Sequence, residues 1–91
     1  MKKNQDQIEL FLTQVGLNIK KQRVKKGFTL EALGEDLGIG KSNMFRIEQG
    51  KNITLITLLK ISAYLEVHPT KFFQNTSDVS VEEIERYLAK K

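Results

Sequence analysis

Residues 30–47 read LEALGEDLGIGKSNMFRI, and this stretch decides how the chain folds. Its apolar residues recur at spacings of three and four on both sides of a glycine-containing centre, which is typical of two short helices. These apolar positions are Leu33, Leu37, Ile39, Met44 and Ile47. Gly34 leaves room for two helices to cross closely, and Gly38 lets the chain reverse within a short turn. The stretch therefore predicts a pair of helices joined by a tight turn.

The centre of the stretch, GIGKS at residues 38–42, contains the Gly-Lys-Ser order that also closes a nucleotide-binding P-loop. A complete P-loop requires a further glycine at the position of Glu35, and it follows a β-strand. Here an acid would face the phosphates, and residues 30–37 have helical spacing. A helix-turn-helix is therefore the favoured interpretation, and nucleotide binding the least favoured.

The sequence on either side of this stretch predicts further helices and no confident strand. We expect a first helix over residues 7–26 that stops at Gly27, and one over residues 55–65 that Thr54 caps. A short turn follows His68, which is expected to cap it, and Ser80 with Glu83 forms a capping-box pattern before a last amphipathic helix. The predicted fold class is all-α, with a compact domain over residues 1–74 and a linker plus C-terminal helix over residues 75–91.

Charge is unevenly distributed along the chain. Residues 1–77 carry twelve Lys or Arg against seven Asp or Glu, whereas residues 78–91 carry three against four, which together give the net charge of +4. The densest basic cluster lies at Lys20, Lys21, Arg23, Lys25 and Lys26. Such a cluster suits a phosphate backbone or an anionic surface, although a solvated helix end would also carry it.

Composition argues against several classes of protein. The 91 residues make one small domain, which leaves little room for a deep enzyme pocket, so we expect no enzyme and no cofactor. With no cysteine and one histidine, no metal site is expected. The start lacks the apolar core of a secretory signal, and no apolar run approaches a membrane span, so we expect a cytoplasmic protein without a membrane partner.

Longer segments of the chain resemble a known family, the lambda-repressor/Cro-like or XRE helix-turn-helix domains of phage and bacterial transcription regulators. The similarity covers residues 15–73 and shows in IKKQR at 19–23, GFTLEALG at 27–34, RIEQGK at 46–51 and TLLKISAYLEV at 57–67. Residues 52–73 look like the small dimeric controller proteins of restriction-modification systems. The resemblance implies a five-helix lambda-repressor-like bundle, followed here by the short C-terminal helix. Leu30 departs from the usual glutamine, which puts one expected DNA contact in doubt, and Gly34 replaces the usual alanine.

The resemblance also implies which residues act. Residues 41–49 would form the recognition helix, with Lys41, Ser42 and Arg46 reaching base edges in the major groove. Other contacts, to the backbone or to a thymine methyl, are expected from Thr29, Asn43, Phe45, Lys51 and Asn52. Arg23 and Glu48 match a family pair and are expected to form a shielded ion pair.

The helix at residues 55–65 is apolar nearly all round, so one side should meet a partner chain. Candidates for this interface are Ile56, Leu59, Ala63 and Phe73. We therefore expect a sequence-specific DNA-binding regulator, a repressor or autoregulator, that binds palindromic double-stranded DNA as a homodimer. The alternative is an antitoxin-like or protein-interaction module in which the C-terminal helix docks a protein partner and DNA binding is secondary.

Overall fold

The computed structural model describes residues 6–51 and 53–90. Within them the chain forms helices α1 (Gln7–Lys25), α2 (Leu30–Asp36), α3 (Lys41–Glu48), α4 (Leu55–Leu65) and α5 (Val81–Ala89), with a short 3-10 helix η1 (Pro69–Phe73) between the last two. No strand occurs in the described part of the chain, so the all-α prediction is confirmed. Helix α2 ends one residue earlier than the sequence suggested.

The helix boundaries follow from local capping. Side chains of Asp6, Thr29 and Thr54 accept hydrogen bonds from the first backbone N–H groups of α1, α2 and α4. Ser80 and Glu83 form the complete capping box that the sequence predicted for α5. Gly27 follows the end of α1 with φ at +85°, a conformation that favours glycine.

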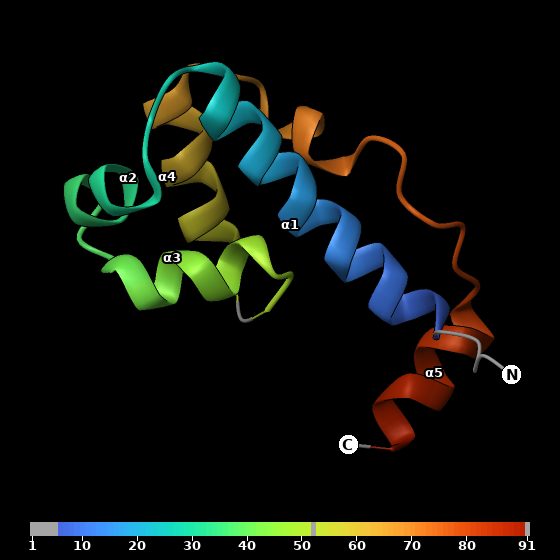
Figure 1. Cartoon of the computed structure of the whole chain (residues 1–91). Helices are drawn as coiled ribbons and strands as arrows, with labels where there is room; N and C mark the ends of the chain where they lie inside the picture. The colour runs from blue at the N-terminus through green and yellow to red at the C-terminus, as the bar shows by residue number, and fades with distance from the viewer. Residues whose placement is uncertain (1–5, 52, 91) are drawn as a thin grey trace, which may run out of the picture.

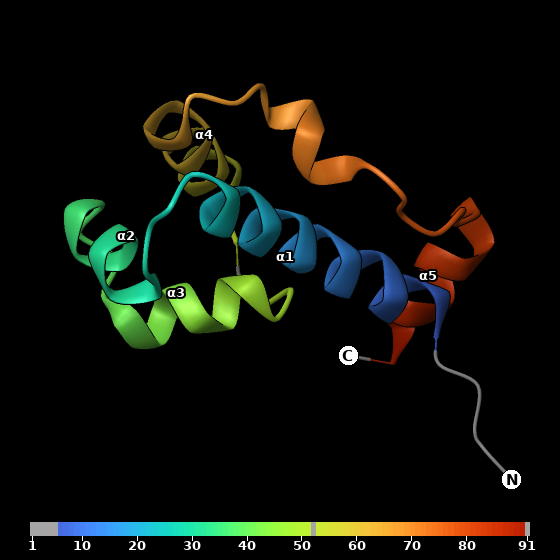
Figure 2. The ribbon, with the colours of Figure 1, turned by 45° about the horizontal axis from the view of Figure 1, so that its top comes forward.

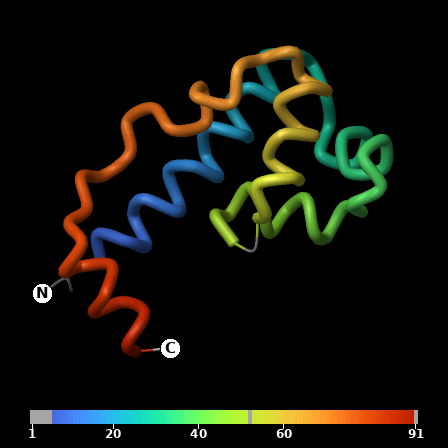
Figure 3. The backbone as a smooth tube through the Cα atoms, turned by 180° about the vertical axis from the view of Figure 1, so that it is seen from behind, coloured from blue at the N-terminus to red at the C-terminus, as the bar shows by residue number. Residues whose placement is uncertain are grey.

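Helix α1 is the longest element, and the other helices are arranged along it (Figure 1). Helices α2, α3 and α4 gather around its C-terminal half, whereas α5 crosses near its N-terminal end. The turned view in Figure 2 and the view from behind in Figure 3 show the same division. No described helix has the length and apolar character needed to cross a membrane.

The core lies where α1, α2, α3, α4 and η1 converge. Its most completely buried side chains are those of Ile19, Leu33, Met44, Ile61, Leu65 and Phe72. A buried polar residue ties η1 to this core, because the Asn18 amide donates to the carbonyl oxygens of Phe72 at 3.0 Å and Gln74 at 2.7 Å. By contrast, α5 packs against α1 without burying any residue fully.

Candidate functional site

Helix α3 presents a polar face to solvent while its opposite face enters the core. Met44, Ile47 and Glu48 are buried. The exposed side carries Lys41, Ser42, Asn43, Phe45 and Arg46, and the exposed Gln49 follows the helix, which ends one residue before the predicted end of the recognition helix. Phe45 is 52% exposed, which is unusual for so large an apolar side chain on a wet surface. One helix thus combines a fixed inner face with an outer face rich in hydrogen-bond donors.

Glycines set the position of α3 against α2. A Cβ added to Gly34 would lie 2.7 Å from the carbonyl oxygen of Gly40, so the backbones are too close for a side chain there. The Gly34 carbonyl accepts from the N–H groups of Ile39 at 2.8 Å and Gly40 at 3.0 Å. Gly38 and Gly40 have φ values of +71° and +89°, as the expected tight turn requires. The GIGKS segment is therefore a turn followed by the first residues of α3.

A second close approach joins α1 to the end of α3. A Cβ on Gly16 would lie 2.5 Å from the carbonyl oxygen of Glu48, and one on Gly50 would lie 2.4 Å from that of Leu12. No local signal predicts this contact, because Gly16 lies inside a helix pattern without any turn residue beside it. Two glycines far apart in sequence therefore let α1 and α3 touch through their backbones.

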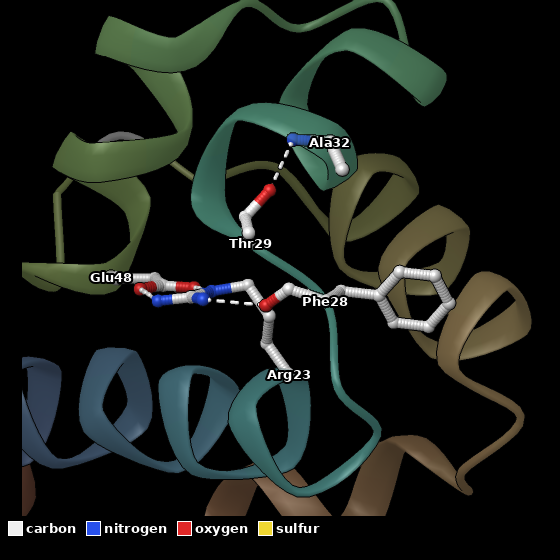
Figure 4. Close-up of polar contacts among 5 residues, drawn as sticks. All are labelled: Arg23, Phe28, Thr29, Ala32 and Glu48. Carbon is white, nitrogen blue, oxygen red and sulfur yellow. Dashed lines mark hydrogen bonds and ion pairs between the residues drawn. The ribbon is translucent and has the colours of Figure 1, made fainter.

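The ion pair between Arg23 and Glu48 locks the same two helices. The Arg23 Nε donates to Oε2 of Glu48 at 2.6 Å, and Nη2 donates to Oε1 at 2.9 Å, so the contact is bidentate. Nη1 donates to the carbonyl of Phe28 at 2.8 Å (Figure 4). This hydrogen bond fixes the loop that leads into α2. The hydrogen bond with Glu48 raises the pKa of Arg23, against the opposing effect of burial. Both side chains are shielded, with 10% and 4% of their surface exposed.

Three polar contacts organise side chains on the exposed face of α3. The Asn43 amide donates to the carbonyl of Ile39 at 3.2 Å, and its oxygen accepts from Nη1 of Arg46 at 3.1 Å. Lys41 Nζ lies 3.4 Å from a carboxylate oxygen of Glu31 in an exposed ion pair. Asn43, which the sequence predicted to contact the DNA backbone or a thymine methyl, also orients the Arg46 guanidinium.

The structure brings most predicted site residues to one shallow hollow beside α3. Lys41, Ser42, Phe45, Arg46 and Lys51 all line it. Leu30, the departure from the family pattern, lines it as well and packs partly against the core, so an apolar group occupies this edge.

Thr29 and Asn43, two predicted contact residues, do not line that hollow. Thr29 is exposed at the start of α2, where its hydroxyl oxygen accepts from Ala32 N–H at 3.0 Å (Figure 4). Its hydroxyl hydrogen is left to donate elsewhere. Asn52 lies outside the described residues.

The predicted interface residues lie on the exposed side of α4 and on η1. Ile56 and Leu59 are 62% and 49% exposed, and Ala63 is exposed one turn further along. Phe73 lies on η1 and packs against Phe11 of α1, with ring centroids 6.4 Å apart. Leu55, which the sequence analysis did not propose as an interface residue, is 76% exposed and borders an apolar hollow of about 170 Å³ that Phe11 and Phe73 also line.

His68 caps η1, since its Nδ1 accepts from the Thr70 N–H at 3.2 Å. This agrees with the capping role predicted from sequence. Among the described residues there is no group of three or more His, Cys, Asp or Glu side chains that could hold a metal ion.

Comparison with known proteins shows which family and which solved structure this chain is similar to. The helix-turn-helix family matches residues 19–72. An uncharacterized HTH-type transcriptional regulator, y4aM of Sinorhizobium fredii, is 35% identical over 65 residues, which are 70% of this chain and 46% of that protein. The chain therefore spans about half the length of this curated relative. The crystal structure of the restriction-modification controller protein C.AhdI from Aeromonas hydrophila matches with a TM-score of 0.64 and 28% identity, over 68% of this chain and 96% of that one.

Proposed function

Because this chain belongs to the helix-turn-helix family, we propose that it is a sequence-specific DNA-binding regulator of transcription that acts as a homodimer. The resemblance to XRE domains and to restriction-modification controllers that the sequence indicated is confirmed at the level of family and fold. The observation that carries the proposal is the exposed face of α3, which is polar and basic and belongs to a helix held rigidly by Gly34, Gly16 and the Arg23–Glu48 pair.

In this proposal α3 enters the major groove, which is wide enough to admit a helix. Lys41 and Arg46 donate to guanine O6 and N7, and Ser42 makes a further base contact at the start of the helix. A good bidentate pair contributes roughly 1–3 kcal/mol of discrimination against the wrong base. The hydrogen bond from Arg46 to Asn43 supports this role, because it reduces the freedom that the guanidinium loses on binding.

Backbone contacts come from residues around α3. Thr29 and Lys51 hold phosphates on the two sides of the helix, and Asn52 follows Lys51 in sequence. Phe45 is exposed beside Arg46 and suits a thymine methyl. The positive balance of residues 1–77 favours approach to the duplex at low salt.

Dimerisation through the exposed side of α4 and through η1 would place two copies of α3 on one face of the duplex. The operator would then be palindromic, with half-sites about 34 Å apart. Occupancy of such a site regulates by excluding or recruiting polymerase, and repression or autoregulation is the form we favour. No chemical step is required of the chain.

Selection from a random duplex library, followed by fluorescence anisotropy titration at several salt concentrations, tests this function. Arg46→Ala should relax the preference at one base pair, whereas Lys25→Ala, if this lysine meets phosphate, should weaken binding to all sequences alike. Equal affinity of the unchanged chain for every duplex, unaltered by Arg46→Ala, would contradict a sequence-specific regulator.

A second function, a protein-interaction module, is supported by α5. None of its residues is buried, and Val81 and Leu88 are 66% and 62% exposed although they lie on its apolar side. Deleting residues 78–91 distinguishes the two functions. A DNA-binding regulator keeps its affinity for the selected half-site, whereas an interaction module loses its protein partner.

A further inference from the structure

Helix α5 has an apolar side that its own chain leaves exposed. The helix lies outside residues 19–72, which match the helix-turn-helix family, so it is an addition to the family domain. Val81, Ile84 and Leu88 follow the helical spacing of three and four along one side, and they are 66%, 40% and 62% exposed. An apolar side of this kind indicates a contact with a further surface.

The apolar face of α1 connects α5 to the rest of the molecule. Val15 belongs to the core, whereas Ile8, two turns earlier on the same face, is buried at the end of α1 that α5 crosses. Between these two residues, Phe11 and Leu12 line the apolar hollow of about 170 Å³ that Leu55 borders. The hollow therefore lies between α5 and the start of α4 along one face of α1.

Most of the exposed large apolar side chains gather on this side of the molecule. Figures 1 and 3 show α5 and the start of α4 on the same side of α1. Among residues 6–51 and 53–90, all but three such side chains lie on α5, beside the hollow or on the outer side of α4. The three others are Leu17 and Val24 on the opposite face of α1 and Phe45 on α3. We call this surface the apolar patch: α4 forms one end, α5 the other, and the hollow lies between them.

Charge narrows the kind of surface that covers α5. The helix carries Glu82, Glu83 and Glu85 against Arg86, so it repels a polyanion such as DNA or an anionic membrane. Residues 1–77 carry twelve Lys or Arg against seven Asp or Glu. A second copy of this chain therefore presents both an apolar patch and a positive field to the acidic helix.

The size of a stable dimer interface also favours a contribution from α5. Such interfaces involve about 20–30 residues a side. Helix α4 has 11 residues and η1 has 5, and each of them turns one side to the core, so these two elements alone fall short of that size. The hollow and the 9 residues of α5 extend the surface toward it.

We propose that α5 is a dimer clasp: in the homodimer, the apolar side of α5 in one copy packs on the exposed side of α4 in the other copy. The inference rests on the homodimer of the proposed function. A two-fold interface pairs the same patch on both copies. With the axis near the hollow, a turn of 180° brings the α5 end of each patch onto the α4 end of the other.

The hollow lies at the centre of this arrangement. An apolar cavity of about 150 Å³ accommodates one benzene ring, so a hollow of about 170 Å³ can receive one large apolar side chain. Leu55 borders the hollow and is 76% exposed, so Leu55 of the partner subunit is the side chain that enters it. Leu88, at the far end of the patch, then lies beside Leu59 of the partner subunit.

Leu88→Glu tests the clasp by sedimentation velocity over a range of protein concentrations. The contact occurs twice in a two-fold dimer, and the loss of one buried leucine side chain weakens association about tenfold or more. We therefore expect the dimer Kd to rise about a hundredfold. Lys90→Gln shifts the net charge by the same amount on the other side of α5 and should leave the Kd unchanged.

Two further measurements separate a dimer contact from a role within one chain. Because Leu88 is 62% exposed, Leu88→Glu should leave unchanged both the melting temperature of the dilute monomer and its affinity for the selected half-site. A lower melting temperature of the monomer with an unchanged dimer Kd would restrict α5 to its own chain and would overturn the clasp.

Cross-linking locates the contact, because the chain has no cysteine and a bismaleimide reacts only at introduced thiols. Leu88→Cys and a mass-tagged Leu59→Cys are mixed, left to exchange subunits and cross-linked. We expect a covalent heterodimer in this mixture, and much less of it when Lys90→Cys replaces Leu88→Cys. Equal yields from the two mixtures would overturn the placement of α5 on α4.

The remaining outcomes distinguish the clasp from the function on which it rests. An unchanged Kd for Leu88→Glu, with a dimer that Ile56→Glu still dissociates, would overturn the clasp and leave the homodimer intact. If Leu88→Glu also lost a different protein that co-purifies with the unchanged chain, the apolar side of α5 would belong to that partner. A monomeric unchanged chain at every concentration would overturn both the clasp and the homodimer.

Discussion

Replacing Glu48 by glutamine should destabilise the fold strongly, although the side chain keeps its size. Glutamine retains one acceptor for the Arg23 guanidinium, but its amide nitrogen replaces the second carboxylate oxygen and turns two hydrogen-bond donors toward each other. The positive charge of Arg23 then stays in a place where its side chain is only 10% exposed. The guanidinium still donates to the carbonyl of Phe28, but this acceptor carries no negative charge.

The magnitude follows from the shielding of the pair. Removing one partner of a buried ion pair costs about 3–5 kcal/mol, because the other charge is left unpaired. In a domain of this size 1 kcal/mol shifts the melting temperature by about 4–8 °C, so we expect a fall of at least about 12 °C. Glu48 also ends α3, so affinity for the selected duplex should fall even at temperatures where the variant is still folded.

Thermal unfolding followed by circular dichroism at several scan rates measures this effect. Glu35→Gln removes the same charge from an exposed position on α2 and should melt within about 2 °C of the unchanged chain. The double variant Arg23→Met, Glu48→Leu should recover most of the loss, because no charge is then stranded. A fall of less than about 4 °C for Glu48→Gln would refute the structural role of the pair.

Four further predictions follow from single contacts. Gly16→Ala should lower the urea midpoint, because the new Cβ would lie 2.5 Å from the carbonyl oxygen of Glu48. Helix propensity alone would have the opposite effect and stabilise α1 by about 1 kcal/mol. An unchanged or higher midpoint would contradict the close packing of α1 and α3. Ile56→Glu should turn a dimer into a folded monomer in sedimentation velocity, since a charge at a 62% exposed position disturbs an interface and not the core; a dimer of unchanged stability would place the interface elsewhere. Asn43→Ala should weaken binding to the selected duplex and narrow its advantage over a scrambled one, because Arg46 loses the oxygen that orients it, and an unchanged ratio in anisotropy titrations would show that Asn43 does not position Arg46. The hydrogen bond to Asp36 raises the pKa of Tyr64 above the ordinary phenol value of about 10, so the contact stabilises the folded state while the phenol is protonated. This stabilisation is lost as the pH rises through the higher pKa of the folded state, and the urea midpoint should fall over that range. Asp36→Asn should remove this part of the fall.

Local sequence signals determined the helices and the turn well. Each cap acts within a few residues, so Thr54 and Ser80 indicated helix starts that the structure reproduces. The apolar spacing of residues 30–47 likewise determined which side of α3 is buried, because a helix places residues three and four apart on one face. The other residues of α3 could therefore be predicted to form its exposed face.

Contacts between distant segments could not be predicted in the same way. Asn18 looks like any polar residue of an amphipathic helix, and only the fold shows that it holds η1 through two carbonyl oxygens. Lys60 lies in an apolar helix pattern that favours packing, and only the crossing of α4 and α3 brings it to a basic hollow that Arg46 and Lys51 also line. The Arg23–Glu48 pair came from a family resemblance, since nothing local relates residues 25 positions apart.

The sequence by itself therefore determined the elements of this protein and the outer face of α3, because capping, glycine conformation and helical periodicity act over one or two turns. Only the tertiary structure decided how that face is held and what lies beside it. Backbone contact at Gly16, the shielded Arg23–Glu48 pair and the basic hollow at Lys60 each require segments that are distant in sequence to meet, and such contacts depend on packing of the whole core.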